Sequence, residues 1–409
     1  MRTPFAALTL SALLAATPAS AEKLTIWVVG DETTPKILQP AVDLYKKDHP
    51  NVTFEVRAVP GDQAFTKYLA ALASRSGPDI ITGYLSYGIE IGKKGGLLNL
   101  QEKYPALVSS VRKTANKGIL DSITSVDGNV YALPYDLTVQ LMYYRKDLVK
   151  TPPRTWAELT ATLDKLRASG NKGLVQQWGN AGWVGFFPYL KQAGGNLYDA
   201  RCTQATINSA AGVTALTYYA QLYTKYKGPT DGWPDMEQGL ENGDYALGMT
   251  GNWSMQSIRT GRPKLDGKWG ITMLPKGPTG KSTAFEGGSL IGIMSYTKVP
   301  DLAADFIKQL YSTRTTVAMI KGANELGTLW LPAGRQDLVT QVNLPADQKA
   351  ILMRQLSDSD GPPNCPGWEQ SGDAVQKAVQ QVVFNGASPK AALDDAAKTM
   401  NANLSKYGK

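Results

Sequence analysis

The sequence predicts an α/β protein of two lobes, each with helices packed on a mostly parallel sheet. Strand and helix patterns alternate as β-α-β-α-β between residues 23 and 81, which is typical of a doubly wound parallel sheet. The length of 409 residues is enough for two domains. Extended segments follow without a low-complexity linker, which favours two lobes joined by crossing strands over two separate domains.

The first lobe begins with a regular series of elements. The apolar run 23–29 predicts a buried strand, and apolar residues at helical spacing predict a helix over 36–47. Residues 51–58 alternate as a half-buried strand does. We expect Asp62 to cap the next helix, and Gly77-Pro78 to end it before a third strand that begins at Asp79.

The later elements are more widely spaced. Residues 131–136 and 140–144 read as strand, break and strand. Pro134 inside the extended run favours an edge strand or a crossing between sheets, because proline cannot donate to a sheet ladder. Thr155 and Glu158 form a capping box that opens a helix. A further helix starts at 208, strands are expected at 245–249, 268–274 and 288–294, Asp301 caps another helix, and Ser388-Pro389 begins the last one.

Composition narrows the classes of protein. Hydrophobic residues make up 43% of the chain, as in an ordinary globular protein. The net charge of +8 comes from scattered lysines and arginines, so we expect no nucleic-acid partner. Residues 1–21 have the pattern of a signal peptide cleaved near Ala21, and no cysteine follows to accept a lipid. We therefore expect an exported, periplasmic protein without a membrane span.

Two cysteines and one histidine limit the other chemistry. In an exported protein we expect Cys202 and Cys365 to form a disulfide. The single His49 makes a metal site improbable, and no cofactor motif is present. The GKS at residues 280–282 ends a segment that has Pro275 where a phosphate-binding loop needs glycine, so a nucleotide site is rejected.

One stretch, residues 241–254, indicates a ligand site. A short apolar strand ends at Gly251, and Asn252, Trp253 and Ser254 follow directly. Ligands of open α/β sheets bind beyond the carboxyl ends of the strands. A flat aromatic ring beside an amide and a hydroxyl suits a sugar, whose ring faces are apolar and whose edges carry hydroxyl groups.

The chain resembles the family 1 extracellular solute-binding proteins, the maltose-binding-protein group that serves ATP-binding-cassette importers. The resemblance spans nearly the whole mature chain and depends on LTIWVVGD, PDIITGYLSYGIEIGKKGGLLNL, YALPYDLTVQLMYYRKDL, TPPRTWAEL, ENGDYALGMTGNWS and KWGITMLPKGPTGKSTAFEGGSLIGI, in this order. It implies the type II periplasmic-binding-protein fold, with a ligand cleft between the lobes that closes by hinge motion. It places residues 22–135 and 283–313 in lobe 1, and 136–282 and 314–409 in lobe 2.

The resemblance also implies which residues face the cleft. Trp253 matches the aromatic residue after a strand end, although Asn252 replaces the family's usual proline. The complete set of expected ligand-binding residues is Asp31, Glu32, Tyr84, Ser86, Asp136, Trp178, Trp183, Trp253, Glu286, Gly287, Gly288, Trp330 and Trp368. No residue of this set is expected to be catalytic.

The sequence therefore predicts a monomeric binding protein that captures a mono- or oligosaccharide and delivers it to a membrane permease. A phosphorylated polyol such as glycerol phosphate is the alternative ligand, although it would need arginine or lysine in the cleft. An exported carbohydrate-active enzyme is a third hypothesis. It would need two facing carboxylates, which Asp136 with Glu32 or Glu286 could imitate.

Overall fold

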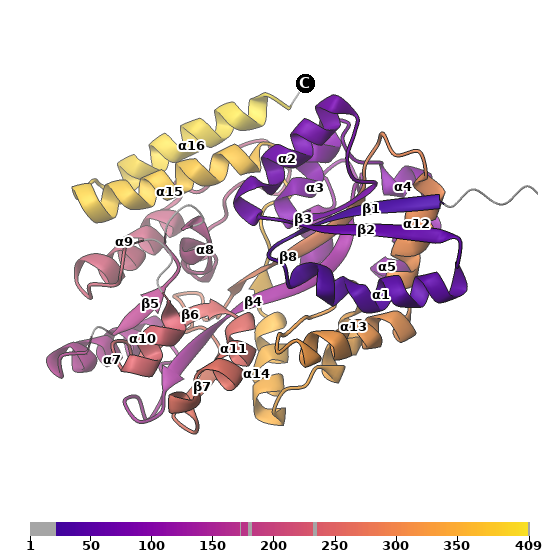
Figure 1. Cartoon of the computed structure of the whole chain (residues 1–409). Coiled ribbons are helices and arrows are strands. Elements are labelled where there is room, and N and C mark those ends of the chain that lie inside the picture. The colour runs from indigo at the N-terminus through magenta and orange to yellow at the C-terminus, as the bar shows by residue number, and fades with distance from the viewer. Residues whose placement is uncertain (1–21, 172, 179–181, 232–234, 408–409) are drawn as a thin grey trace, which may run out of the picture.

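The computed structural model describes residues 22–171, 173–178, 182–231 and 235–407. Two α/β halves lie on either side of a pair of long central strands, β4 and β8 (Figure 1). Among the described residues the strands form one connected sheet in the order β2-β1-β3-β8-β4-β6-β5, with β7 also paired to β4 and β9 to β8. The predicted signal peptide lies outside the described residues.

The first half has the parallel arrangement that the sequence predicts. Strand β1 pairs in parallel with both β2 and β3, and its Leu24, Ile26 and Val28 are fully buried. The elements of this half are β1 (Glu22–Val29), α1 (Thr34–Asp48), β2 (Val52–Val59), α2 (Gly61–Ser74), β3 (Ile80–Tyr84), α3 (Leu85–Lys93), α4 (Leu100–Lys103), α5 (Pro105–Arg112) and α6 (Lys117–Ile123).

The two halves are joined by β4 (Leu133–Arg145) and β8 (Ala284–Ile293). The first part of β4 pairs with β8, and its last part pairs with β6 (Leu247–Gly251) and β7 (Trp269–Thr272). The expected break between two separate strands is wrong. Pro134 is accommodated inside one continuous strand of 13 residues, where the register shifts between Pro134 and Asp136.

The second half contains a shorter parallel pair, β5 (Leu174–Gln176) with β6. Its capping box is confirmed, because the Thr155 side chain accepts from Glu158 N and the Glu158 carboxylate accepts from Arg154 N. The helices of this half are α7 (Trp156–Ala168), α8 (Trp183–Gln192), α9 (Ala210–Thr224), α10 (Met236–Asn242), α11 (Trp253–Gly261) and η1 (Pro263–Leu265).

Two other expected caps are wrong. Helix α2 begins after Pro60, so Asp62 lies in its first turn and makes no capping bond. Asp301 likewise lies in the first turn of α12, after Val299. An acidic side chain in a first turn still interacts favourably with the helix dipole, and this explains why the sequence pattern resembles a cap.

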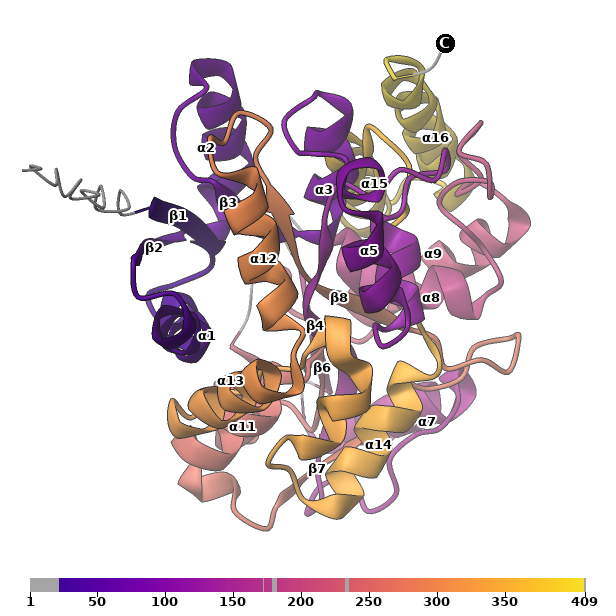
Figure 2. The ribbon, with the colours of Figure 1, turned by 90° about the vertical axis from the view of Figure 1, so that its right-hand side faces the viewer.

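The remaining elements complete both halves (Figure 2). They are α12 (Pro300–Leu310), α13 (Thr313–Glu325), η2 (Ala333–Gln341), α14 (Ala346–Leu356), β9 (Ser359–Asp360), α15 (Trp368–Asn385) and α16 (Pro389–Ser405). Helix α13, which the expected boundary at 313 assigns to lobe 2, packs against α1 of the first half. The lobe boundaries stay a prediction.

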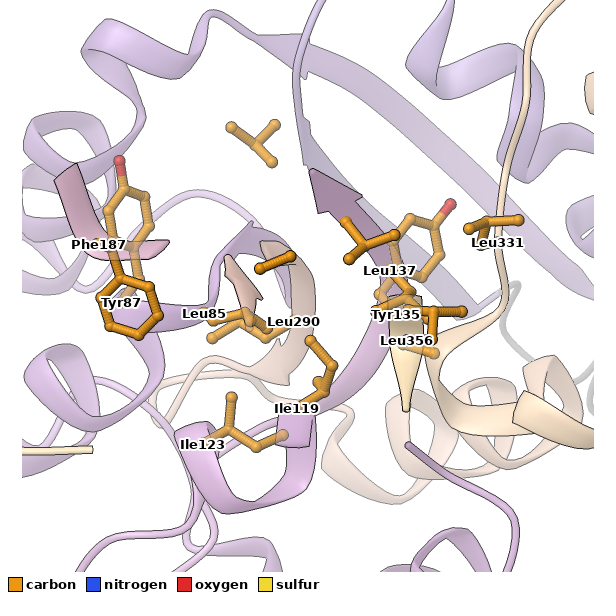
Figure 3. Packing of buried hydrophobic residues seen from close by; sticks show 14 of the residues in the cluster. Leu85, Tyr87, Ile119, Ile123, Tyr135, Leu137, Phe187, Leu290, Leu331 and Leu356 are labelled. Atoms are coloured by element: carbon orange, nitrogen blue, oxygen red, sulfur yellow. The ribbon is translucent and has the colours of Figure 1, made fainter. Parts of the chain in front are cut away.

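Apolar packing is continuous across the junction between the halves. In Figure 3, Tyr135 and Leu137 of β4 lie beside Leu331 and Leu356, which come from the C-terminal third of the chain. These four side chains are at most 5% exposed. The side of β4 that carries Tyr135 and Leu137 is therefore packed against residues about two hundred positions away in the sequence.

The C-terminal helices are attached to the first half by a buried acid. Glu90 of α3 is 2% exposed, and its carboxylate accepts from Gly367 N (2.9 Å) and from the Tyr407 hydroxyl. Lys94 Nζ donates to the same hydroxyl (2.8 Å). This contact joins α3 to the beginning of α15 and the end of α16.

The expected disulfide is present between Cys202 and Cys365, whose Cα atoms are 5.5 Å apart. It ties the loop before α9 to the segment before α15 and spans 163 residues of sequence. Among the described residues, no helix is long and apolar enough to cross a membrane.

The double variant Cys202→Ala/Cys365→Ala should lower the free energy of unfolding by about 2–4 kcal/mol, because the unfolded chain regains the freedom that a long cross-linked loop removes. Urea unfolding followed by circular dichroism measures this. Dithiothreitol should destabilise the wild type similarly and leave the variant unchanged. Equal stability of variant and oxidised wild type would show that the disulfide contributes nothing.

Candidate functional site

Two exposed aromatic rings stand where strands from the two halves end. Tyr84 is the last residue of β3 and is 48% exposed. Trp253 follows β6 and is 40% exposed. Most large apolar side chains of the protein are buried, so exposed rings at carboxyl strand ends indicate a binding surface.

The strand register places both rings on one face of the sheet. Tyr84 lies opposite Ser289 of β8, and Ser289 lies opposite Asp136 of β4. Directly opposed residues of antiparallel strands point to the same side, and alternate residues along a strand do so too. Thr138 and Gln140 therefore continue the row from Asp136 along β4.

The row reaches Trp253 through a glycine. Gln140 pairs with Gly251, and a side chain at Gly251 would collide with the Trp253 ring. The ring thus lies over Gly251, beside Gln140 on the same face. We call the surface formed by Tyr84, Ser289, Asp136, Thr138, Gln140 and Trp253 the polar face.

Asp136 is the central carboxylate of this face. It accepts from Ser289 N (2.6 Å) and from the Ser289 hydroxyl (3.3 Å). Burial raises the pKa of Asp136 to about 6, against the opposing effect of these two bonds. Gly288, with φ of +136°, lets β8 pass this closely, since a side chain there would collide with the Asp136 carbonyl.

Further carboxylates lie near enough to Tyr84 to affect its hydroxyl group. Burial, followed by the charges of Asp136, Asp62 and Glu369, raises the pKa of Tyr84. These three acids come from β4, α2 and α15, and none of them forms an ion pair within the described part of the chain. The surroundings of Tyr84 are therefore rich in hydrogen-bond acceptors and poor in cations.

Sequence reasoning missed Glu369. It follows Trp368 in the first turn of α15, and burial raises its pKa to about 7. The hydroxyl of Ser86 is close enough to Glu369 to oppose this rise, which places the expected site residue Ser86 at the same spot. The sequence offered one indication of Glu369, its position directly after the expected site residue Trp368. Its closeness to Ser86 could not be predicted, because only the fold brings α15 next to α3.

A cavity of about 320 Å³ adjoins Trp253 beyond the carboxyl ends of β5 and β6. Arg262 lines it, but its guanidinium group is already held by Asp235 (3.1 Å) and Glu241 (3.5 Å). The described residues that line the cavity therefore offer polar groups to a ligand, but no unpaired cationic side chain. The whole lining consists of Val175, Gln176, Gln177, Asp235, Met236, Glu237, Met249, Thr250, Trp253, Ser254 and Arg262.

Trp183 lies at the start of α8 and is partly exposed. Its ring meets Trp368 and Phe285 edge to face, with ring centroids 4.8 and 5.3 Å apart. Phe285 is the residue of β8 two positions before Gly287, where a side chain would collide with Phe285 and crowd Thr138. These contacts place Trp183 next to the polar face.

The other three expected tryptophans lie in the interior. Trp178, Trp330 and Trp368 are 4%, 7% and 3% exposed. Trp178 packs on Tyr223 and Phe384, and Trp330 packs on Tyr135. A buried ring has no free face on which a sugar could stack, so this conformation does not support a ligand role for these residues. That role stays a prediction.

Asp31 and Glu32 follow β1 at the edge of the sheet where its parallel neighbour, β3, ends in Tyr84. Asp31 and Glu32 are exposed, and the Asp31 carboxylate accepts from Thr33 N (2.8 Å) within its own turn. Asn252 is also structural, since its side-chain oxygen accepts from Val139 N (2.8 Å) and its backbone N–H donates to Val139 O. In place of the proline usual in the family, this amide joins the end of β6 to β4.

Glu286 points to the opposite side of β8 from Phe285 and Gly287. It is 1% exposed, accepts from the Ser359 hydroxyl, and has a second carboxylate oxygen without a partner. Burial raises its pKa to about 7. Its side chain therefore lies inside the protein, in contact with the segment that contains β9.

Within the described residues, no group of three or more histidine, cysteine, aspartate or glutamate side chains could hold a metal ion.

Two α/β halves joined by crossing strands, with exposed rings at both ends of a polar surface, define a two-lobed binding protein. The sequence model described as bacterial extracellular solute-binding protein matches residues 30–316, and the chain belongs to this family. Members of this family are binding proteins.

Individual relatives agree with this assignment. The chain is 26% identical to a lactose-binding protein of Rhizobium radiobacter, over 76% of this chain and 75% of that protein. It is 24% identical to a maltodextrin-binding protein of Bacillus subtilis (strain 168), over 76% and 73%. A solute-binding protein of Thermotoga lettingae TMO, solved with α-D-tagatose, has a TM-score of 0.79 at 22% identity and covers 94% of this chain and all of that one. The predicted two-lobed fold is thereby confirmed.

The variant Glu286→Gln should change how stability depends on pH. The wild-type acid binds its proton more tightly when folded, so folding stability falls as pH rises from about 4.5 to about 7. The variant loses this decline and should be more stable than the wild type at pH 8 by roughly 2–3 kcal/mol. Thermal or urea unfolding at pH 5 and pH 8 measures it, and pH 5 is the internal control. Parallel pH profiles would contradict the assignment.

Proposed function

We propose that this protein binds a mono- or oligosaccharide on the polar face between Tyr84 and Trp253 and delivers it to the permease of an ATP-binding-cassette importer. The observation that supports this most directly is the pair of exposed aromatic rings at the two ends of a row of carboxylate, hydroxyl and amide groups. Rings cover the apolar faces of sugars, and the polar row satisfies hydroxyl groups. Lactose- and maltodextrin-binding relatives support the same ligand class.

Closure of the two halves would complete the site. Movement at β4 and β8 would bring ligand-bound surfaces together and exclude water, which strengthens each hydrogen bond to Asp136 and its neighbours. The closed form would then present both halves to the permease.

A phosphorylated polyol fits this surface less well. Phosphate recognition requires free arginine or lysine. The carboxylates around Tyr84 would repel an anion, and Arg262 is engaged by acids. An enzymatic role is also less favoured, because Glu286 is 1% exposed and lies on the opposite side of β8 from the polar face, so it does not oppose Asp136 across that face.

The proposal also covers export, location in the cell, oligomeric state and nucleic-acid binding. We infer export through cleavage near Ala21, a periplasmic location without a lipid anchor, a monomeric state, and no nucleic-acid partner. The signal-like segment and the scattered basic charges support these inferences.

Tryptophan fluorescence of the purified mature protein with glucose, maltose, lactose, maltotriose and glycerol 3-phosphate tests the ligand class. We expect saturable changes with at least one saccharide and none with the phosphate. Binding of glycerol 3-phosphate alone would contradict the proposal. New reducing ends after prolonged incubation with the oligosaccharides would indicate an enzyme instead.

The variant Trp253→Ala should weaken saccharide binding by about 1–3 kcal/mol, or roughly 5- to 150-fold, because one stacking surface is lost. Stability should change little, since the ring is 40% exposed. Isothermal titration calorimetry measures the affinity. Phe384→Ala removes another exposed aromatic ring, on α15 and outside the polar face, and is the matched control. An unchanged Kd for Trp253→Ala would remove this ring from the site.

A further inference from the structure

Two buried glutamine side chains, on either side of the start of α8, have polar atoms without a hydrogen-bond partner. Gln140 and Gln376 are 5% and 6% exposed. The side-chain oxygen of Gln140 and both polar atoms of the Gln376 amide have no partner. Leaving such groups buried and unpaired is costly, so each one indicates a missing hydrogen-bonding group.

Gln140 is fixed in place at one end only. Its Nε2 donates to the carbonyl oxygen of Val184 (3.4 Å) in the first turn of α8. Its Oε1 remains free as an acceptor. Because Gln140 belongs to the row of the polar face, the residue lies between Thr138 and the Trp253 ring.

Gln376 approaches the same helix end from α15. Residues 369, 372 and 376 share one side of α15, since they are three and four positions apart. At Gly372 a side chain would crowd the Trp183 ring, and at Gly182 a side chain would collide with the Gln376 amide. The stripe thus runs from Glu369, near Tyr84, past Trp183 to the residue that precedes α8.

The beginning of α8 itself offers donors. The helix has ten residues, and its N-cap, Gly182, provides no side-chain hydrogen bond. The N–H groups of Gly185 and Phe186 donate to Gly182 O. The donors that the start of α8 offers are therefore the N–H groups of Trp183 and Val184, which carry partial positive charge. Acceptor and donor groups therefore meet at one spot, which suits hydroxyl groups because each hydroxyl both donates and accepts.

We propose that Gln140, Gln376 and the start of α8 form an end subsite for the outer ring of a saccharide of two or more rings. This inference rests on the proposed function and specifies its substrate class. Asp136 and Gln140 are four residues apart on an extended strand, or about 13 Å. One hexose ring at Asp136 does not span this length, so the ring that contacts Gln140 and Gln376 belongs to a second sugar unit.

The variant Gln376→Leu tests the end subsite. Leucine has similar volume and no unpaired polar atoms, so the ligand-free protein should melt at the same temperature as the wild type or higher. Binding of maltose, lactose or maltotriose should weaken at least about tenfold, while binding of glucose, which needs no second unit, should stay within about twofold.

The matched control is Gln355→Leu. Gln355 is fully buried, and its amide donates to Ser282 O and Asp358 O (both 2.9 Å) and accepts from Leu274 N (2.8 Å). Its loss should lower the melting temperature and leave saccharide affinity of the folded protein unchanged. The two glutamines should therefore give opposite patterns of stability and binding.

The outcomes separate this inference from the proposed function. A wild type that binds none of the saccharides contradicts the proposed function. A Gln376→Leu protein that melts lower than the wild type contradicts the end subsite without any saccharide, because the amide would then be paired, for example by a structural water. Equal losses for glucose and the longer saccharides, or none for either, would also overturn it.

Discussion

The continuity of β4 is the constraint on which the rest of the structure depends. One strand pairs with β8 in its first part and with β6 and β7 in its last part, so both halves share a single backbone. Asp136, Thr138 and Gln140 form a row because the strand does not break, and the aromatic rings at its two ends are aligned by strand register.

The architecture was largely predictable from the sequence. Alternating apolar patterns fixed the order of elements in the first half, because strands buried on both faces and amphipathic helices have distinct periods. The place of Trp253, just beyond the end of β6, was predictable because the residue follows a short apolar strand and a glycine. Pro134 indicated an edge strand or a crossing between sheets, and β4 does cross from β8 to β6 and β7. The expected break after residue 136 is wrong, because a local register shift lets one continuous strand accommodate the proline.

The rest of the candidate site depends on contacts that no local pattern records. Glu369 and Gln376 are ordinary polar residues of an amphipathic helix until the fold brings α15 against α3 and α8. Trp330 and Trp368 sit beside glycine or proline like loop residues, yet long-range packing buries them. Asn252 likewise has an ambiguous sequence context, and only the proximity of Val139 shows that its amide stabilises the crossing strand.

The bond between Glu90 and Gly367 has a mechanical consequence. It attaches the start of α15 to the first half, while Cys365, two residues earlier, is tied by its disulfide to the loop before α9. The Glu90–Gly367 bond lies apart from the β4–β8 crossing, so the two attachments together favour rotation of the halves about the line that joins them. Displacement then grows with distance from that axis. A spectroscopic label on α7, which lies far from both attachments in Figure 1, would report such a rotation with large amplitude. One beside Cys365 would hardly move.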